Sequence, residues 1–297
     1  RDPNAPETRG RKRRDAEFDM SDDPMADLDA LGLGGSIDLS DPLAENTARK
    51  QLLDLAKKAA IAGGAEIMEV YQGDFEVVKK DDQSPLTIAD QRSNEVIEKL
   101  LKSSRIPILS EEGIHGSYEE RKSFTYLWIV DPLDGTKEFV KRNGEFTVNI
   151  ALVENGIPIL GVIYVPVKKW MYFGSSAGSF REVGESREKL PLNIKKDVFT
   201  AVGSRSHPSK ETADFFEQLK KEKGNVEVIS MGSSLKICLV AEGAADVYPR
   251  FAPTMEWDTA AGHAIAKFAG KSLIDLETHQ EMIYNRKKLR NNWFIVK

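Results

Sequence analysis

The sequence has few cysteines and no long apolar runs, and both shortages exclude classes of protein. Its 297 residues include a single cysteine, Cys238, so no intrachain disulfide can form. The apolar neighbours Ile237 and Leu239 predict a buried, inert thiol. No apolar run reaches the roughly 20 residues of a membrane helix, and the first residues lack a charged-then-apolar secretory pattern. We therefore expect a cytoplasmic protein without stable membrane insertion, while peripheral membrane association stays open.

Two common nucleotide-binding signatures are also missing. The chain contains neither G-x-G-x-x-G nor G-x-x-x-x-G-K-[ST], which argues against a dinucleotide-binding or P-loop protein. Its four histidines show no metal-ligand spacing.

The charge is concentrated at one end. The net charge is -5, but residues 1–45 hold 6 Lys/Arg and 12 Asp/Glu, which leaves 36 and 35 for the remainder. A nearly neutral folded part argues against binding a nucleic-acid polymer, yet leaves room for a local cationic pocket. Residues 1–40 are rich in Asp, Pro, Gly and Arg and show no hydrophobic period, so we expect a disordered tail.

The rest of the chain predicts a layered α/β protein of two subdomains, residues 41–190 and 191–297. Alternating apolar residues over 145–173, interrupted by Asn155-Gly156, predict an antiparallel sheet with a tight hairpin turn. Later segments alternate strand and helix. The expected helices span 42–71, 88–100, 208 onward, 233–242 and 259–269, and the other expected strands span 75–78, 106–109, 126–130, 200–203, 226–230 and 246–248.

The most informative segment is Asp-Pro-Leu-Asp-Gly-Thr at residues 131–136, which follows a buried strand. Pro132 prevents a continuing ladder hydrogen bond, so the chain must turn here. The turn can direct Asp131, Asp134 and the carbonyl of Leu133 toward one point, and such oxygens suit Mg²⁺. An ordinary surface turn is the alternative.

Three other acidic positions add to this pattern, although each has a simpler explanation. Glu111 opens a Glu-Glu pair after an apolar strand, and such a pair is often only solvated surface. Asp258 lies where a loop enters a helix, which it could simply cap. Asp90 lies in the first turn of a helix, where it could compensate the helix dipole.

Taken together, these motifs resemble a known family. Asp-Pro-Leu-Asp-Gly-Thr, with Ser-Glu-Glu upstream and Glu-Trp-Asp-Thr-Ala-Ala-Gly much later, resembles the two-part signature of the inositol monophosphatase superfamily. More narrowly, residues 134–152, Gly-Ser-Arg-Ser-His at 203–207 and Pro-Thr-Met-Glu-Trp-Asp at 253–258 resemble the CysQ-type 3'(2'),5'-bisphosphate nucleotidases. The resemblance covers roughly residues 45–297. It implies an αβαβα sandwich with an antiparallel N-terminal sheet and a mixed C-terminal sheet.

The resemblance also implies roles for individual residues. The metal ligands for two or three Mg²⁺ ions would be Glu111, Asp131, Leu133 through its carbonyl, Asp134 and Asp258.

The remaining roles concern the attacking water and the phosphate. Thr136, with Glu111, would orient and help deprotonate the water, and Asp90 would serve a more weakly held metal or its water. Gly135 and Thr136 would hold the scissile phosphate through their amides, with Asp258 on the substrate side. Phosphate esters need such cations because they are anionic and poorly electrophilic.

Three cations are candidate partners for a second phosphate, namely Arg205, Lys236 and Arg250. A solvated surface charge is the alternative for each. The leading hypothesis is hydrolysis of adenosine 3',5'-bisphosphate, and of its sulfated analogue, by a magnesium-dependent and lithium-sensitive enzyme of sulfur metabolism. A phosphatase of inositol phosphates or fructose 1,6-bisphosphate is the nearest alternative. A non-catalytic nucleotide-binding regulator is another, against which the presence of Thr136 with four carboxylates speaks. The oligomeric state stays open.

Overall fold

The computed structural model describes residues 42–73, 77–79, 85–206 and 209–297. Its helices are α2 (Pro42–Gln72), α3 (Ile88–Leu101), the 3-10 turn η1 (Lys102–Ser104), α4 (Tyr118–Arg121), α5 (Thr136–Val140), α6 (Lys210–Lys223), α7 (Leu235–Ala241) and α8 (Glu256–Phe268). All the described residues fall within one compact unit. The division at residue 190 stays a prediction, and the predicted tail, residues 1–40, lies outside the described ranges.

The larger sheet runs through the first half of the chain. Its seven strands are ordered β3 (Ile108–Ser110), β4 (Tyr126–Asp134), β5 (Thr147–Glu154), β6 (Ile157–Val165), β7 (Trp170–Ser175), β8 (Gly178–Val183) and β9 (Ser186–Lys189). All neighbours are antiparallel except β3 and β4, which are parallel. The antiparallel sheet was thus predicted correctly apart from this edge, and β8 and β9 extend it beyond the predicted strands.

The predicted hairpin turn is confirmed. Asn155 and Gly156 have φ angles of 50° and 79°, as the tight two-residue turn between β5 and β6 requires.

The C-terminal half contributes a second, mixed set of strands. The strands β10 (Phe199–Ser204) and β11 (Val226–Met231) are parallel. The antiparallel group consists of β12 (Tyr248–Arg250), β15 (Phe294–Val296), β13 (Leu273–Asp275) and β14 (Gln280–Glu281). A parallel bridge between Ala201 and Val247 connects the two groups. The remaining strands β1 (Val77–Lys79) and β2 (Pro85–Thr87) form a small hairpin.

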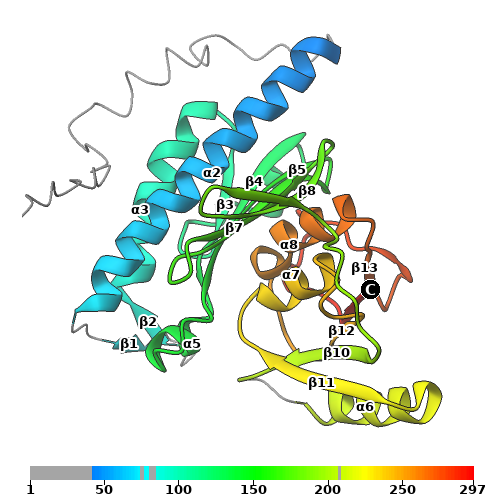
Figure 1. Cartoon of the computed structure of the whole chain (residues 1–297). Coiled ribbons are helices and arrows are strands. Elements are labelled where there is room, and N and C mark those ends of the chain that lie inside the picture. The colour runs from blue at the N-terminus through cyan, green and yellow to red at the C-terminus, as the bar shows by residue number, and fades with distance from the viewer. Residues whose placement is uncertain (1–41, 74–76, 80–84, 207–208) are drawn as a thin grey trace, which may run out of the picture. The chain divides into compact units, whose positions relative to one another are not determined.

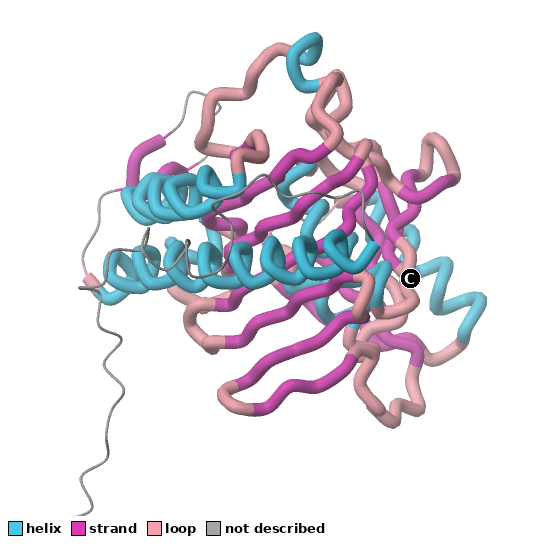
Figure 2. Tube along the Cα trace, turned by 90° about the horizontal axis from the view of Figure 1, so that it is seen from above, coloured by secondary structure: helices cyan, strands magenta, loops and turns pink. Residues whose placement is uncertain are grey.

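The layers follow the predicted αβαβα order (Figure 1). Helices α2 and α3 pack together on one face of the seven-stranded sheet, and Figure 2 looks onto this face. Helix α8 covers the other face through its contacts with β4 to β8. Helix α7 joins α8 to β10 and β12, and α6 covers β10 and β11. The site described below lies where the ends of α7 and α8 meet the first sheet.

Several element boundaries differ from the predicted ones by two residues or more. Helix α8 begins at Glu256, three residues before the predicted start, so Asp258 lies inside its first turn. Strand β12 begins at Tyr248 and not at Asp246, whose carboxylate instead accepts a hydrogen bond from the amide of Thr200 at 2.7 Å. The predicted strand at 75–78 is found as Val77–Lys79 among the described residues.

The core confirms the prediction for Cys238. Its thiol is 1 % exposed inside the main apolar cluster, and burial raises the pKa of this thiol well above its ordinary value. In the described part of the chain, no helix is both long enough and apolar enough to cross a membrane.

Candidate active site

The parallel edge of the larger sheet brings two predicted acidic residues together. Strands β3 and β4 pair so that Ser110 lies opposite Val130. The next residue, Glu111, donates its backbone N–H to the carbonyl of Val130 at 3.1 Å. Because parallel strands end at the same edge, Glu111 lies beside Asp131.

An irregularity near the end of β4 directs Asp131 and Asp134 to the same side. The carboxylate of Asp131 accepts a hydrogen bond from the N–H of Leu133 at 3.1 Å. The carbonyl of Pro132 accepts one from the hydroxyl of Ser93 on α3 at 2.8 Å. The register with β5 shifts between the two aspartates. The predicted turn at Pro132 is therefore wrong: β4 continues through an anchored irregularity, and its pairing with β5 resumes at Asp134 and Thr147. The segment is also not a solvated surface loop.

Asp258 completes a three-carboxylate cluster from the opposite side. It is the third residue of α8, and its carboxylate accepts the N–H of Met255 at 2.7 Å. Carboxylate oxygens of Asp131, Asp134 and Asp258 all lie within 4.8 Å of one another. The capping explanation for Asp258 is thus true, and the same carboxylate also faces the cluster.

Burial and mutual repulsion dominate the electrostatics of this cluster. Asp131 is 1 % exposed, and burial raises the pKa of its carboxyl well above the ordinary value, with further increases from Glu111, Asp134, Asp258 and Asp90. Burial and the charges of Asp134 and Glu111 raise the pKa of Asp258 to about 8. Crowded carboxylates of this kind need cations among them. An all-oxygen donor set fits hard divalent ions such as Mg²⁺.

Two residues that sequence reasoning missed fix the orientation of Asp134. The backbone N–H of Ser234 donates to its carboxylate at 2.6 Å, and the hydroxyl of Ser234 contacts the same oxygen. The amide of Asn149 on β5 donates to it at 3.2 Å and to the Ser234 hydroxyl at 2.7 Å. The available signal was weak: Asn149 is a polar residue in an apolar strand, and Ser234 precedes a helix.

The Gly135-Thr136 step begins helix α5, as predicted. Gly135 has a φ of +92°, and a Cβ there would lie 3.2 Å from both the carbonyl of Glu145 and the Cβ of Ser233. Glycine is therefore required for both conformation and space. Helix α5 is only five residues long, so any phosphate contact here depends on the local amides and not on a long helix dipole.

A pair of buried cations lies near the acidic cluster. Lys236 and Arg250 are 6 % and 9 % exposed. The Lys236 ammonium donates to the carbonyl of Ser233 at 2.6 Å, and the Arg250 guanidinium donates to that of Pro253 at 3.2 Å. Burial, together with the nearby Arg250 charge, lowers the pKa of Lys236 to about 8 despite the opposing pull of Asp134.

The acidic cluster and the two cations line the same cavity, which has a volume of about 430 Å³. Of the predicted residues, those that line it are Glu111, Asp131, Leu133, Asp134, Gly135, Thr136, Lys236, Arg250 and Asp258.

Two predicted residues do not line this cavity. Asp90 is 1 % exposed in the first turn of α3 and acts on Asp131 through its charge. Arg205 forms a two-pronged ion pair with Glu145, both contacts at 2.8 Å, and donates to the carbonyl of Ser230 at 2.8 Å. The guanidinium of Arg205 is therefore engaged within the protein.

Comparison with known proteins agrees with this fold. The model of the inositol monophosphatase family matches residues 48–293, and the chain belongs to that family. It is 46 % identical over 230 residues to the 3'(2'),5'-bisphosphate nucleotidase CysQ of Salmonella typhimurium, covering 76 % of this chain and 89 % of that protein.

Solved structures show the same likeness. The crystal structure of CysQ from Bacteroides thetaiotaomicron superimposes with a TM-score of 0.77 at 51 % identity, covering 82 % of this chain and 96 % of that one. The inositol monophosphatase of Thermotoga maritima gives a TM-score of 0.67 at 25 % identity, covering 82 % and 91 %.

Proposed function

We propose that this protein is a Mg²⁺-dependent 3'(2'),5'-bisphosphate nucleotidase that hydrolyses adenosine 3',5'-bisphosphate to AMP and phosphate. Its sulfated analogue would be cleaved at the same position. The proposal rests on one cavity that is lined both by a carboxylate cluster and by two buried cations. A substrate with two separate phosphates matches both groups, and the similarity to CysQ nucleotidases supports the choice of a nucleotide.

The carboxylate group would hold two or three Mg²⁺ ions through Glu111, Asp131, Asp134 and Asp258, with the carbonyl of Leu133 as a further ligand. When bound, the ions would lower the pKa of the attacking water and neutralise charge on the phosphate. Ser234 and Asn149 would keep the Asp134 carboxylate aimed at this position through their hydrogen bonds.

The neighbouring residues would handle the proton and the phosphate. The hydroxyl of Thr136 would help to orient the attacking water, and Glu111 would accept its proton. The amides of Gly135 and Thr136 would hold the scissile phosphate. Asp90 would support a more weakly held ion through its charge next to Asp131.

The cationic group would bind the second phosphate. Lys236 and Arg250 face the cavity, and a dianion between them would relieve their mutual repulsion. Arg205 does not enter this proposal, because its guanidinium pairs with Glu145. A cytoplasmic location fits a nucleotide substrate and belongs to the same proposal.

The test is phosphate release from adenosine 3',5'-bisphosphate, inositol 1-phosphate and fructose 1,6-bisphosphate, each with Mg²⁺ and with EDTA. We expect Mg²⁺-dependent release that strongly favours the nucleotide. Preference for either other substrate would overturn the nucleotidase assignment while leaving the metal site in place. No release from any of the three would favour a non-catalytic nucleotide-binding protein.

A further inference from the structure

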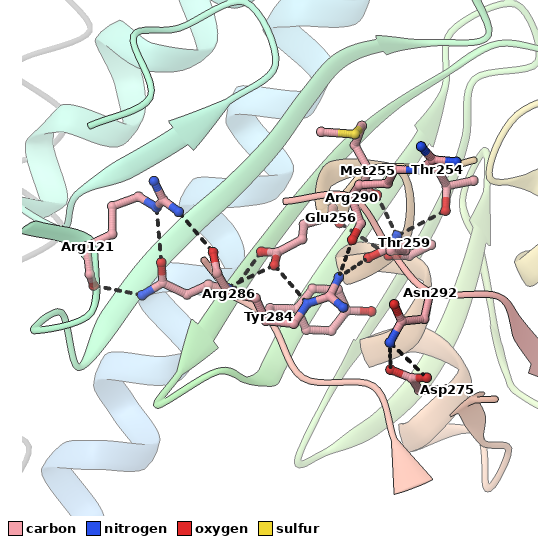
Figure 3. A network of polar contacts seen from close by, with 12 residues as sticks. Arg121, Thr254, Met255, Glu256, Thr259, Asp275, Tyr284, Arg286, Arg290 and Asn292 are labelled. Carbon is pink, nitrogen blue, oxygen red and sulfur yellow. Dashed lines mark hydrogen bonds and ion pairs between the residues drawn. The ribbon is translucent and has the colours of Figure 1, made fainter. Parts of the chain in front are cut away.

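A largely buried polar network surrounds the first turn of α8, which carries Asp258 (Figure 3). Its centre is Glu256, which is 0 % exposed and immediately precedes Trp257 and Asp258. The Glu256 carboxylate accepts the backbone N–H of Asn285 at 2.7 Å and the backbone N–H of Arg286 at 3.0 Å. It also accepts the side-chain Nε–H of Arg286 at 3.2 Å. Both carboxylate oxygens are thus occupied by donors from one segment near the C-terminus.

The network continues from Arg286 to the residue that hydrogen-bonds Asp258. The Arg286 guanidinium donates to the side-chain carbonyl of Asn291 at 2.7 Å. The side-chain amide of Asn291, in turn, donates to the carbonyl of Met255 at 2.7 Å and to the hydroxyl of Thr259 at 3.0 Å. The N–H of Met255 donates to the Asp258 carboxylate at 2.7 Å. An unbroken series of contacts therefore runs from Glu256 around to the carboxylate that faces the cavity.

The segment of residues 285–291 also reaches the loop after Glu111. The side chain of Arg121, 6 % exposed, donates to the carbonyl of Gly116 at 2.6 Å and to that of Arg286 at 3.0 Å. The side-chain amide of Asn285 donates to the carbonyl of Arg121 at 2.7 Å. The 285–291 segment therefore connects the loop that follows one predicted metal ligand to the helix turn that carries another.

The first turn of a helix needs a cap, but it does not need the ion pair between Glu256 and Arg286. Asp258 already satisfies the N–H of Met255, so an ion pair whose carboxylate is fully buried adds desolvation cost to a turn that is capped without it. Such a pair can instead fix the orientation of a nearby carboxylate. Groups that hydrogen-bond metal-ligating carboxylates orient them and tune metal affinity.

We propose that Glu256, Arg286 and Asn291 are positioning residues that hold the Asp258 carboxylate in its metal-binding orientation. The inference rests on the proposed function only in taking Asp258 as a ligand of Mg²⁺. It concerns the affinity for the metal and not the choice of organic substrate. Replacing Glu256 should therefore weaken Mg²⁺ binding while the Michaelis constant for the nucleotide, measured at saturating Mg²⁺, stays unchanged.

The decisive experiment measures Mg²⁺ binding to the full chain by calorimetry, without substrate, for the wild type and for Glu256→Gln. Glutamine keeps the size but cannot accept hydrogen bonds at both terminal atoms. We expect the dissociation constant for Mg²⁺ to rise about 10- to 100-fold. The matched control is Glu242→Gln, which neutralises another buried carboxylate, paired with Arg181 and Tyr172. It should lower the melting temperature without changing Mg²⁺ affinity.

A second variant covers the case in which Glu256→Gln does not fold. Arg286→Lys keeps the charge at a less buried side chain but cannot reach Glu256 and Asn291 together, and it should weaken Mg²⁺ binding in the same direction. Wild-type Mg²⁺ affinity in the folded variant or variants would overturn the inference, whatever their stability. A wild type that binds Mg²⁺ but releases no phosphate from a nucleotide would refute the proposed function alone, because the affinity comparison would still decide the inference.

Discussion

Asp131 combines the deepest burial and the most carboxylate neighbours of the cluster. We predict that Asp131→Asn abolishes phosphate release and leaves the fold intact. Asparagine can still accept the N–H of Leu133, and it removes a buried charge that four neighbours repel. The melting temperature in EDTA should therefore equal or exceed that of the wild type, while the stabilisation by Mg²⁺ is lost. Retained turnover in this variant would remove the proposed metal site.

Replacing Lys236 tests the role of the cations that line the cavity. Lys236→Met should lower kcat/KM for adenosine 3',5'-bisphosphate about 30-fold or more, because losing a buried charged partner of the second phosphate costs roughly 2 kcal/mol or more. Adenosine 3'-phosphate, which lacks that phosphate, is the matched control and should be hydrolysed almost equally by both proteins. An equal loss on both substrates would show that Lys236 shapes the site and does not bind the second phosphate.

Among single residues, the sequence predicted correctly those cavity-lining residues that are close neighbours in the chain. Asp131, Leu133, Asp134, Gly135 and Thr136 follow one another, so one motif predicts all five as lining the cavity. Residues whose role depends on distant partners could not be found in this way. Ser234 meets Asp134 across 100 residues of chain. The Glu145 partner of Arg205 lies 60 residues away, so nothing local showed that this guanidinium is occupied.

Among the elements, α8 was predicted as a helix, whereas its starting residue was not predicted correctly. A helix was predicted over 259–269, but its first turn begins three residues earlier, at Glu256. That turn is held by the 285–291 segment, since Glu256 donates its N–H to the carbonyl of Leu289 at 2.9 Å and accepts from Arg286. The parallel edge between β3 and β4 was missed for a similar reason, because strand direction follows from the connection through α4 and not from the composition of either strand.

The close approach of α8 to the larger sheet yields a prediction for one glycine. A Cβ on Gly161 of β6 would lie 2.3 Å from the carbonyl of Ala261 on α8. Gly161→Ala should therefore displace the helix and lower the free energy of unfolding by about 1–3 kcal/mol, measured by urea denaturation. Mg²⁺ affinity should fall with it, because α8 carries Asp258. Gly73→Ala is the matched control, with its nearest contact at 3.8 Å, and an equally small effect at Gly161 would contradict the predicted close packing.

For the whole molecule, the carboxylate cluster should make stability depend on pH and on metal together. The pKa of Asp258 is raised from 3.8 to about 8 in the folded chain. Between these values the folded protein binds a proton that the unfolded chain has lost. The contribution of Asp258 to stability therefore falls as the pH rises from about 4 to about 8. Metal binding acts in the opposite direction, because Mg²⁺ requires ionised carboxylates and binds only the folded site.

Thermal unfolding of the wild type and of Asp258→Asn from about pH 5 to about pH 8, in EDTA and in Mg²⁺, measures both effects. Comparing the two proteins cancels the titration of groups elsewhere, and asparagine can still accept the N–H of Met255. In EDTA, the melting temperature of the variant relative to the wild type should rise with pH. In Mg²⁺ this difference should reverse, since only the wild type gains metal-binding energy as the cluster ionises. A pH-independent difference in EDTA would show that Asp258 is ionised throughout this range without metal, and that its neighbours repel it less than their burial and spacing imply.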